Sequence, residues 1–273
     1  MLDHGGMAAD CRRIRNRIID AIHRAGSGHS GGSLSCVEIL WTLYSGVLCV
    51  RPEEPDWPDR DRFVLSKGHA APALYAVLAE KGFFSTEELN VLRCAGSSLQ
   101  GHPDMRKVPG VEMSTGSLGM GISVGVGMAL AARLAGRPSR ICVLVGDGEL
   151  QEGQNWEALM AARKFGLGNL SVIVDRNGVQ LDGPTDEIMP LLDIGAKIRS
   201  FGWEVSSCNG HDCARLREAL MWARDATELP RAVVAETVKG RGVSFMEGRS
   251  AWHGKTISPD DYAAAKAELG GDA

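Results

Sequence analysis

The sequence ICVLVGDGELQEGQNWEALMAARKFGLGNLSVIVDRNGVQLDG occupies residues 141–183 and predicts one βαβ unit. Residues 141–145 form a short apolar run rich in β-branched side chains, which is typical of a buried strand. Residues 152–165 place apolar side chains at helical spacing with charged residues between them. Residues 170–174 form a second apolar run. This order predicts two parallel neighbouring strands that are joined by a right-handed crossover.

Polar residues follow both strands at the point where each strand ends. Asp147 lies between Gly146 and Gly148 after the first strand, and Asn177 follows the second strand. Parallel neighbours lie about 5 Å apart, so we expect both side chains at the edge of the sheet where α/β proteins bind ligands. A carboxylate, an amide oxygen and backbone carbonyls suit Mg²⁺ or Ca²⁺. The two glycines would let a large anion approach the backbone.

A purely structural alternative exists for the same residues. The sequence Gly-Asp-Gly also suits a tight turn, and Asn177-Gly178 suits a hairpin turn. The combination of both motifs at the ends of successive strands favours a site for a metal-bound diphosphate.

The composition excludes several classes of protein. The chain has 273 residues, of which 44% are hydrophobic and 23% charged, enough for one large α/β domain. The formal net charge of −4 and the lack of a basic run argue against nucleic-acid binding. The longest apolar stretch, residues 118–132, is too short and too rich in glycine for a membrane span. Seven cysteines without a CxxC pair suit buried thiols in a cytoplasmic protein.

We expect the whole chain, residues 1–273, to form a single domain. Strand-like and helix-like segments alternate along it, which predicts an α/β fold with a doubly wound parallel sheet. Residues 1–9 are expected to be a loose leader and residues 237–258 an irregular segment in the active site. Residues 259–273 are expected to form a terminal helix and tail.

Four histidines lie beside glycines in predicted loops. They are His29 in GSGHSGG, His69 in SKGH, His102 in QGHP and His253 in AWHGK. Taken singly, each is more often an ordinary surface or core histidine than a ligand-binding one. An imidazole can nevertheless donate a hydrogen bond to a hydroxyl, a phosphate or a developing alkoxide.

At these motifs the chain resembles the transketolase family. Gly-Asp-Gly, 28 further residues and then Asn177 resemble the thiamine-diphosphate signature. The sequences GDGELQEGQNWEA and LDGPTDEI resemble transketolase specifically, and the resemblance extends from about Arg13 to Lys255. It implies the thiamine-diphosphate-binding fold, thiamine diphosphate as cofactor, and Mg²⁺, with Ca²⁺ or Mn²⁺ as alternatives.

The resemblance also implies roles for individual residues. His69 and His253 would contact the diphosphate and flank the thiazolium, while His29 and His102 would hydrogen-bond the sugar; these four form the implied catalytic set. Further cofactor contacts are implied for Gly116, Ser117, Leu118, Gly146, Gly148, Glu149 and Asn177. Asp147, Asn177 and the backbone carbonyl of Val179 would bind the metal.

Some positions depart from the family or stay ambiguous. Ser30 replaces the proline that usually follows the first histidine, and Arg176 differs from the commoner residue, so we assign it no role. Glu152 and Glu157 suit the first turns of a helix, where acidic residues are stabilising. The resemblance alternatively places such carboxylates in the interface between active sites.

The resemblance further implies a partner protein. In the family, a glutamate on a second, pyrimidine-binding domain activates the cofactor, and that domain normally follows in the same polypeptide. We therefore expect this chain to be the amino-terminal subunit of a two-component transketolase. It would transfer a two-carbon ketol unit between phosphorylated or similarly acidic sugars. The expected assembly is a heterotetramer of two such chains and two partner chains, and the chain alone is expected to be inactive.

Two alternative functions stay open. The chain could be half of another thiamine-diphosphate enzyme, such as a deoxyxylulose-phosphate synthase or an oxoacid dehydrogenase component, although the histidine loops argue against this. It could also be a non-catalytic regulatory subunit; the intact Asp147, Asn177 and four histidines argue against that reading.

Overall fold

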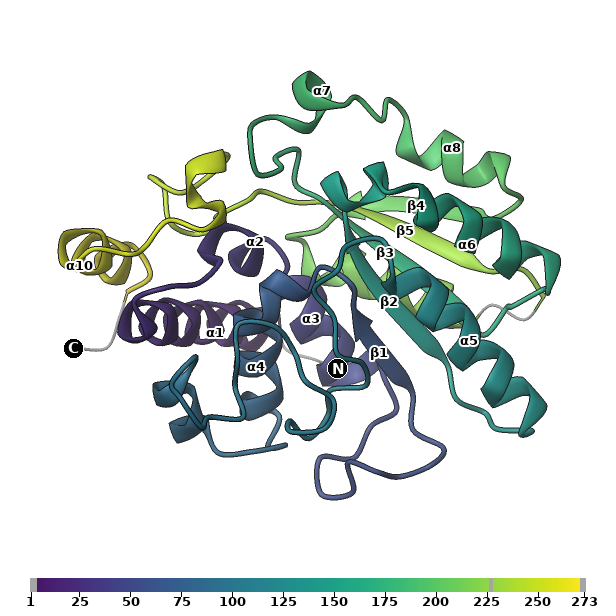
Figure 1. Cartoon of the computed structure of the whole chain (residues 1–273), viewed down its shortest axis with the longest axis horizontal. Coiled ribbons are helices and arrows are strands. Elements are labelled where there is room, and N and C mark those ends of the chain that lie inside the picture. The colour runs from purple at the N-terminus through teal and green to yellow at the C-terminus, as the bar shows by residue number, and fades with distance from the viewer. Residues whose placement is uncertain (1–3, 226–227, 271–273) are drawn as a thin grey trace.

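The computed structural model describes residues 4–225 and 228–270 of the chain. Its core is a five-stranded sheet in the order β1-β2-β3-β5-β4, in which every pair of neighbours is parallel (Figure 1). The strands are β1 (Arg62–Leu65), β2 (Ile141–Gly146), β3 (Leu170–Arg176), β4 (Glu204–Asn209) and β5 (Arg231–Glu236). Because the strands are parallel, all of them end at one edge, which we call the carboxyl edge; the opposite one is the amino edge.

Helices cover both faces of this sheet. They are α1 (His4–Ala25), α2 (Ser30–Leu34), α3 (Val37–Thr42), α4 (Ala71–Glu80), α5 (Gly121–Leu134), α6 (Gly153–Lys164), α7 (Thr185–Ile188), α8 (Ile194–Ser200), α9 (Cys213–Arg224) and α10 (Pro259–Glu268). Short helical turns are η1 (Leu43–Val47), η2 (Gly68–Ala70), η3 (Thr86–Val91), η4 (Gly148–Gln151) and η5 (Ser250–His253). Helices α5, α6 and α8 lie on one face, while α9, backed by α1, α3 and α4, lies on the other.

The chain reverses direction across the sheet after β4, and this reversal explains the two layers of helices. A right-handed crossover places its helix on one face when the chain moves one way and on the other face when it returns. Accordingly α6 and α8 precede the reversal, and α9 follows it. The prediction of a doubly wound parallel sheet is confirmed.

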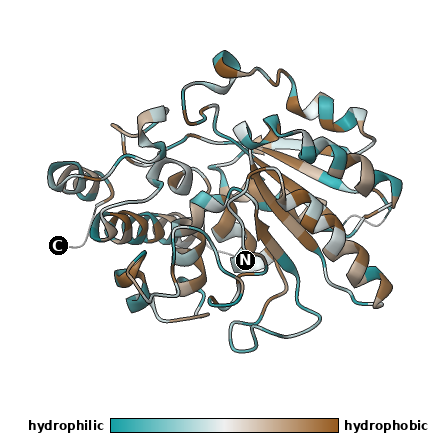
Figure 2. Cartoon of the chain, viewed as in Figure 1, coloured by the Kyte–Doolittle hydropathy of each residue, from teal (hydrophilic) through white to brown (hydrophobic). Residues whose placement is uncertain are grey.

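The central strands β2 and β3 are buried on both sides, so their apolar residues belong to two separate cores. Leu144 and Ile173 pack with α1, α3, α4 and α9, whereas their neighbours Val143 and Val172 pack with α5, α6 and α8. Strands that are covered on both faces carry continuous apolar runs rather than alternating ones. Figure 2 shows this as hydrophobic strands in the centre of the molecule and hydrophilic outer loops.

The prediction of a loose leader is wrong for residues 4–9. Helix α1 begins at His4, and Met7 is buried in the core that α1 shares with α3 and α4. Met7 continues the apolar stripe of Cys11, Ile14 and Ile18 at helical spacing, so the helix extends further back than the arginine-rich part suggested. Residues 1–3 of the predicted leader and residues 271–273 of the predicted tail lie outside the described residues.

The irregular segment at residues 237–258 passes the carboxyl edge and reaches α2, which is far from it in sequence (Figure 1). The N–H of Gly240 donates to the carbonyl oxygen of Gly31 at 2.9 Å, and the hydroxyl of Ser30 donates to the carbonyl oxygen of Trp252 at 3.4 Å. Helix α10 follows, and Ser258 and Asp261 form a capping box at its start. No helix in the described ranges is long and apolar enough to cross a membrane.

Candidate active site

Four histidines from four separate loops meet beside the carboxyl edge. His29 precedes α2, His69 lies in η2 after β1, His102 lies in the loop before α5, and His253 ends η5. The ring centroid of His29 lies 5.4 Å from that of His69, 6.2 Å from His102 and 5.3 Å from His253. The rings of His69 and His253 are 4.9 Å apart. The structure therefore brings the four predicted histidines into one cluster, with His29 at its centre.

Burial keeps these rings uncharged near neutral pH. It lowers the pKa of His29 to about 4, assisted by the positive charge of Arg93, and it lowers the pKa of His253 to about 4, assisted by Lys239. Burial also holds the pKa of His69 well below its ordinary value. A neutral imidazole offers one N–H donor and one acceptor nitrogen, so each ring can take part in proton exchange with a ligand.

One nitrogen of the cluster is unsatisfied. Nδ1 of His29 is buried and has no hydrogen-bond partner among the described residues. A buried polar atom without a partner is costly, so this nitrogen is available to a ligand or a water molecule. His102 is the most exposed of the four rings. Its pKa is lowered by its partial burial and by the positive charge of Arg93.

Glycines allow the histidine loops to pack this closely. A Cβ atom at Gly32 would lie 3.1 Å from Nε2 of His69, and one at Gly116 would lie 2.8 Å from the ring of His102. Gly116 also has φ +148°, a backbone conformation that favours glycine. The segment predicted to contact the cofactor thus begins against His102, while Ser117 and Leu118 are exposed.

The predicted metal ligands lie together at the ends of β2 and β3. The carboxylate of Asp147 accepts hydrogen bonds from the N–H of Gly148 at 2.9 Å and from the N–H of Gly178 at 2.6 Å. Oδ1 of Asn177 accepts from the N–H of Val179 at 3.2 Å. Within residues 4–225 and 228–270, no group of three or more His, Cys, Asp or Glu side chains is arranged to hold a metal ion. The predicted set contains a single carboxylate and relies on amide and carbonyl oxygens instead.

Two buried lysines near this edge have opposite environments. Lys67 forms an ion pair with the fully buried Asp175. Burial lowers the pKa of Lys67, but the charge and hydrogen bond of Asp175, together with Cys36 and Asp147, outweigh burial and raise it overall. Among the described residues the hydrogen-bond partners of Lys239 are neutral: its Nζ donates to the carbonyl oxygen of Val179 at 3.1 Å and lies 3.0 Å from Nδ1 of His253. Burial, together with Lys67, lowers the pKa of Lys239 to about 8.

Asp147 is the opposite case to Lys239: a buried carboxylate that forms no ion pair with the described residues. Burial raises its pKa to about 6, and the neighbouring carboxylate of Asp175 adds to the effect. A divalent cation would favour the charged carboxylate, and an anion would favour the charged form of Lys239. A metal-bound diphosphate supplies both charges at once.

The Gly-Asp-Gly segment leaves room for such an anion on one side. A Cβ atom at Gly146 would meet nothing closer than 3.9 Å, whereas one at Gly148 would lie 3.0 Å from the Cβ of Gln180. The open space is therefore above Gly146, while Gly148 permits close packing within the protein.

Glu149, which was predicted to contact the cofactor, is engaged within the protein. Oε1 accepts hydrogen bonds from the hydroxyl of Ser66 and from the N–H of Gly119, and Oε2 accepts from the N–H of Gly146. In this geometry Glu149 ties the loops after β1 and β2 to the segment before α5.

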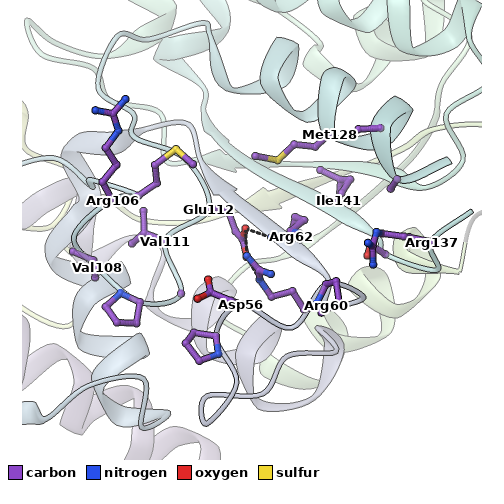
Figure 3. Close-up of a pocket in the computed structure, with 18 of the residues that line it drawn as sticks. Asp56, Arg60, Arg62, Arg106, Val108, Val111, Glu112, Met128, Arg137 and Ile141 are labelled. Atoms are coloured by element: carbon purple, nitrogen blue, oxygen red, sulfur yellow. Dashed lines mark hydrogen bonds and ion pairs between the residues drawn. The ribbon is translucent and has the colours of Figure 1, made fainter. Parts of the chain in front are cut away.

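A separate cavity of about 650 Å³ lies at the amino edge, between the start of β1 and α5 (Figure 3). Its buried carboxylate is paired: Glu112 accepts from Arg60 at 2.6 and 3.0 Å and from Arg62 at 2.7 Å. None of the predicted site residues lines it. The cavity therefore does not coincide with the predicted site.

Sequence reasoning missed Lys67, Asp175 and Lys239. A signal was present, because all three are charged residues that lie at or just after the end of a strand, so parallel strands bring them to the carboxyl edge. Lys67 belongs to the same SKGH sequence as His69, yet only the histidine was singled out.

The chain belongs to the transketolase family. Residues 8–273 match the family described as transketolase, thiamine diphosphate binding domain. The family prediction that rested on the glycine, aspartate and histidine motifs is confirmed.

Two relatives are themselves transketolase subunits of similar length. The chain is 45% identical to the 6-deoxy-6-sulfo-D-fructose transketolase subunit SqwG of Clostridium sp. (strain MSTE9), over 94% of this chain and 93% of that protein. It is 41% identical to an apulose-4-phosphate transketolase subunit of Phocaeicola vulgatus, over 93% of this chain and 90% of that protein.

Solved transketolases share the fold over nearly the whole of this chain. The transketolase of Campylobacter jejuni superposes with a TM-score of 0.93 at 32% identity, covering 99% of this chain but 44% of that one. A Pichia stipitis transketolase gives a TM-score of 0.91 at 33% identity, covering 97% of this chain and 41% of that one. The chain thus spans less than half the length of these enzymes.

Proposed function

We propose that this chain is the amino-terminal, diphosphate-binding subunit of a two-component transketolase. The observation that carries the proposal is the cluster of four uncharged histidines, in which one buried nitrogen has no hydrogen-bond partner among the described residues. Beside this cluster lie Asp147 and Lys239, neither of which forms an ion pair within the described residues, so a ligand could supply both charged partners. Membership of the transketolase family and the two subunit relatives support it.

The residues present fit thiamine diphosphate and a divalent cation, for which we propose Mg²⁺. Asp147, Asn177 and the carbonyl oxygen of Val179 would hold the metal, since hard oxygen ligands suit it. Gly146 would give the diphosphate room, and Lys239 and His69 would neutralise or hydrogen-bond its oxygens. Ca²⁺ or Mn²⁺ would fit the same oxygen set.

The chemistry divides between the cofactor and the protein. Thiamine diphosphate, when bound, supplies the electron sink for breaking a carbon–carbon bond next to a carbonyl group. The protein orients the sugar and moves protons. His29 and His102 would hydrogen-bond the sugar hydroxyls, and the unpaired Nδ1 of His29 is available for this. Neutral rings suit the task because each can accept a proton that the substrate releases and return it later.

We further propose that a partner protein covers the faces of α5 and α6. Large apolar side chains are exposed there and in the loop before α5: Leu118, Met120, Leu134, Met160 and Phe165. Glu152 and Glu157 are also exposed on this side, which fits the proposed interface between active sites. The partner would contribute the pyrimidine-binding domain and the activating glutamate, in a cytoplasmic heterotetramer of two chains of each kind.

The relatives suggest the class of substrate. One is named for a sulfonated ketose and the other for a ketose phosphate, so both names describe sugars with a strong acid at one end. We propose that the present enzyme likewise uses acidic ketoses as two-carbon donors.

Reconstitution tests this function. The chain and a co-encoded protein with a pyrimidine-binding domain are purified separately, and two-carbon transfer from a ketose phosphate is measured for each alone and for the mixture with Mg²⁺ and thiamine diphosphate. We expect activity only in the mixture, with a four-chain mass. Full activity of the isolated chain would refute the two-component proposal. Turnover of pyruvate in place of the ketose would refute the transketolase assignment.

A further inference from the structure

Arg93 connects the two loops that carry His29 and His102. Its backbone N–H donates to the carbonyl oxygen of Leu99 at 2.8 Å, three residues before His102. Its guanidinium Nη1 donates to the hydroxyl of Ser27 at 2.9 Å, two residues before His29. One residue thus binds both loops, although they are about 70 residues apart in sequence.

The guanidinium also fills the space beside Gly101. A Cβ atom at Gly101 would lie 2.6 Å from Nε and 2.8 Å from Cζ of Arg93. Gly101 directly precedes His102, so the absence of a side chain there lets the arginine pack against the backbone of the histidine loop. This contact explains the glycine of the QGHP sequence.

The backbone of Arg93 adopts a conformation that non-glycine residues rarely take. Its φ is +62°, in the left-handed region. Such conformations are retained where surrounding contacts determine them, and they cluster at functional sites. The contacts of Arg93 with Ser27, Leu99 and Gly101 are the ones that determine it here.

Arg93 also brings a positive charge to the cluster. No carboxylate within residues 4–225 and 228–270 forms an ion pair with it. After burial, its charge is the next cause that lowers the pKa of both His29 and His102. The other titratable or charged groups that face His29 are His69, His102, His253 and Lys239, while His102 is faced by His29.

We propose that Arg93 is a positioning residue for the ketol transfer proposed above: it fixes the spacing between the His29 and His102 loops so that both rings meet one substrate. The inference rests on that proposed function for its kinetic consequence. Its structural part concerns this chain alone and is tested without any activity.

The first test follows the histidine rings directly by NMR titration of the isolated full chain. In Arg93→Met, the loss of the charge should raise the pKa values of both His29 and His102, while Arg93→Lys should leave them close to the wild-type values. Arg106→Met removes an exposed arginine from the loop that carries His102 and should change the pKa of neither histidine. Unaltered titration of both rings in Arg93→Met would overturn the electrostatic part of the proposal.

The second test measures the coupling between Arg93 and Gly101. Gly101→Ala in the wild-type background pushes the guanidinium away, so we expect a loss of thermal stability and a changed NMR shift for the His102 ring. In the Arg93→Ala background the same substitution should have little effect, because the space is already free. Equal effects of Gly101→Ala in the two backgrounds would contradict the positional role.

The third test uses the reconstituted enzyme. Arg93→Met should lower kcat/KM about 10- to 100-fold through misplacement of the substrate histidines, with unchanged affinity for thiamine diphosphate. Arg93→Lys keeps the positive charge, so its kcat/KM should fall at low pH as that of the wild type does. The value of kcat/KM should nevertheless recover only in part, because a lysine cannot contact Ser27 and pack on Gly101 together. Wild-type kcat/KM in Arg93→Met would refute the proposal. An inactive wild-type mixture would instead refute the proposed function, and the two NMR tests would still decide the role of Arg93.

Discussion

The two edges of the sheet differ in how their charges are satisfied. At the amino edge, the buried carboxylate of Glu112 is bound by Arg60 and Arg62 (Figure 3). At the carboxyl edge, neither Asp147 nor Lys239 forms an ion pair with any of the described residues. The buried Glu112 at the amino edge therefore has its charged partners within the protein. Asp147 and Lys239 at the carboxyl edge have none among the described residues, so a ligand could supply their charged partners.

This difference indicates that buried charged groups without a charged partner mark the predicted cofactor site better than the volume of a cavity does. The same distinction holds between the two buried lysines of the carboxyl edge. Lys67 is neutralised by Asp175, which also accepts hydrogen bonds from Ser35 and Thr237. It therefore belongs to the framework, whereas Lys239 is available to a ligand.

The largest expected effect concerns these two lysines. Lys67→Met leaves Asp175 buried without its cation, so the free energy of unfolding should fall by about 3–5 kcal/mol. Lys239→Met removes no ion pair and should cost far less stability, while weakening binding of thiamine diphosphate. Urea denaturation of both variants checks the contrast. Equal losses of stability would show that the two lysines do not differ in this way.

A pH effect of up to about 3 kcal/mol is expected from Glu38. Burial would raise its pKa, but the hydrogen bond from His211 and the charge of Arg15 outweigh burial and lower it to about 2. Because the folded-state pKa lies below the unfolded one of about 4.5, this stabilisation is present above pH 4.5 and is lost as the pH falls towards 2. His211 also accepts the N–H of Val238 at 2.9 Å, next to Lys239.

The measurement is the free energy of unfolding between pH 7 and pH 3, compared with Glu38→Gln. The variant should be less stable at pH 7 and should lose less on acidification. An identical pH dependence in both proteins would exclude Glu38 as a source of the acid sensitivity.

Within the histidine cluster we expect a division of roles. His102→Ala should lower turnover about 10- to 100-fold and leave the affinity for thiamine diphosphate unchanged, since this ring is the most exposed. His69→Ala and His253→Ala should lower both, because these rings lie beside the two lysines. Steady-state kinetics and calorimetry separate the two quantities. Loss of cofactor binding with normal kinetics in His102→Ala would reverse the proposed roles.

The smallest effect is expected at the amino edge. Glu112→Gln leaves Arg60 and Arg62 without a charged acceptor, but both reach solvent in part, so the cost should be about 1–2 kcal/mol of unfolding free energy. Turnover and cofactor affinity should not change. A large loss of turnover in this variant would mean that the cavity takes part in the function.

The fold was largely predictable because periodicity and strand ends report it directly. The runs at residues 141–145 and 170–174 lie in β2 and β3, and their order required parallel strands. The start of α1 was less predictable, because Met7 lies among small and polar residues that resemble a leader. Only packing against the core shows that this turn is helical.

The site was predictable in part and for a different reason. Gly-Asp-Gly, Asn177 and the histidine motifs could be recognised as local patterns. The pairing of Lys67 with Asp175 joins residues more than 100 positions apart, and the contact of Arg93 with Gly101 depends on a rare backbone conformation. Such contacts are set by tertiary structure: the strand ends indicate that Lys67 and Asp175 reach the same edge, but the sequence does not indicate that they pair. Glu149 shows the converse, since a motif residue is used within the protein.

The most direct test of the account is calorimetry of thiamine diphosphate binding in the presence of Mg²⁺, with the partner protein present, for wild type, Asp147→Ala and Glu112→Gln. We predict that Asp147→Ala folds but loses magnesium-dependent binding, because the only carboxylate of the proposed metal site is gone, while Glu112→Gln binds as the wild type does. Undiminished binding by Asp147→Ala, or loss of binding in Glu112→Gln, would contradict the assignment of the cofactor to the carboxyl edge.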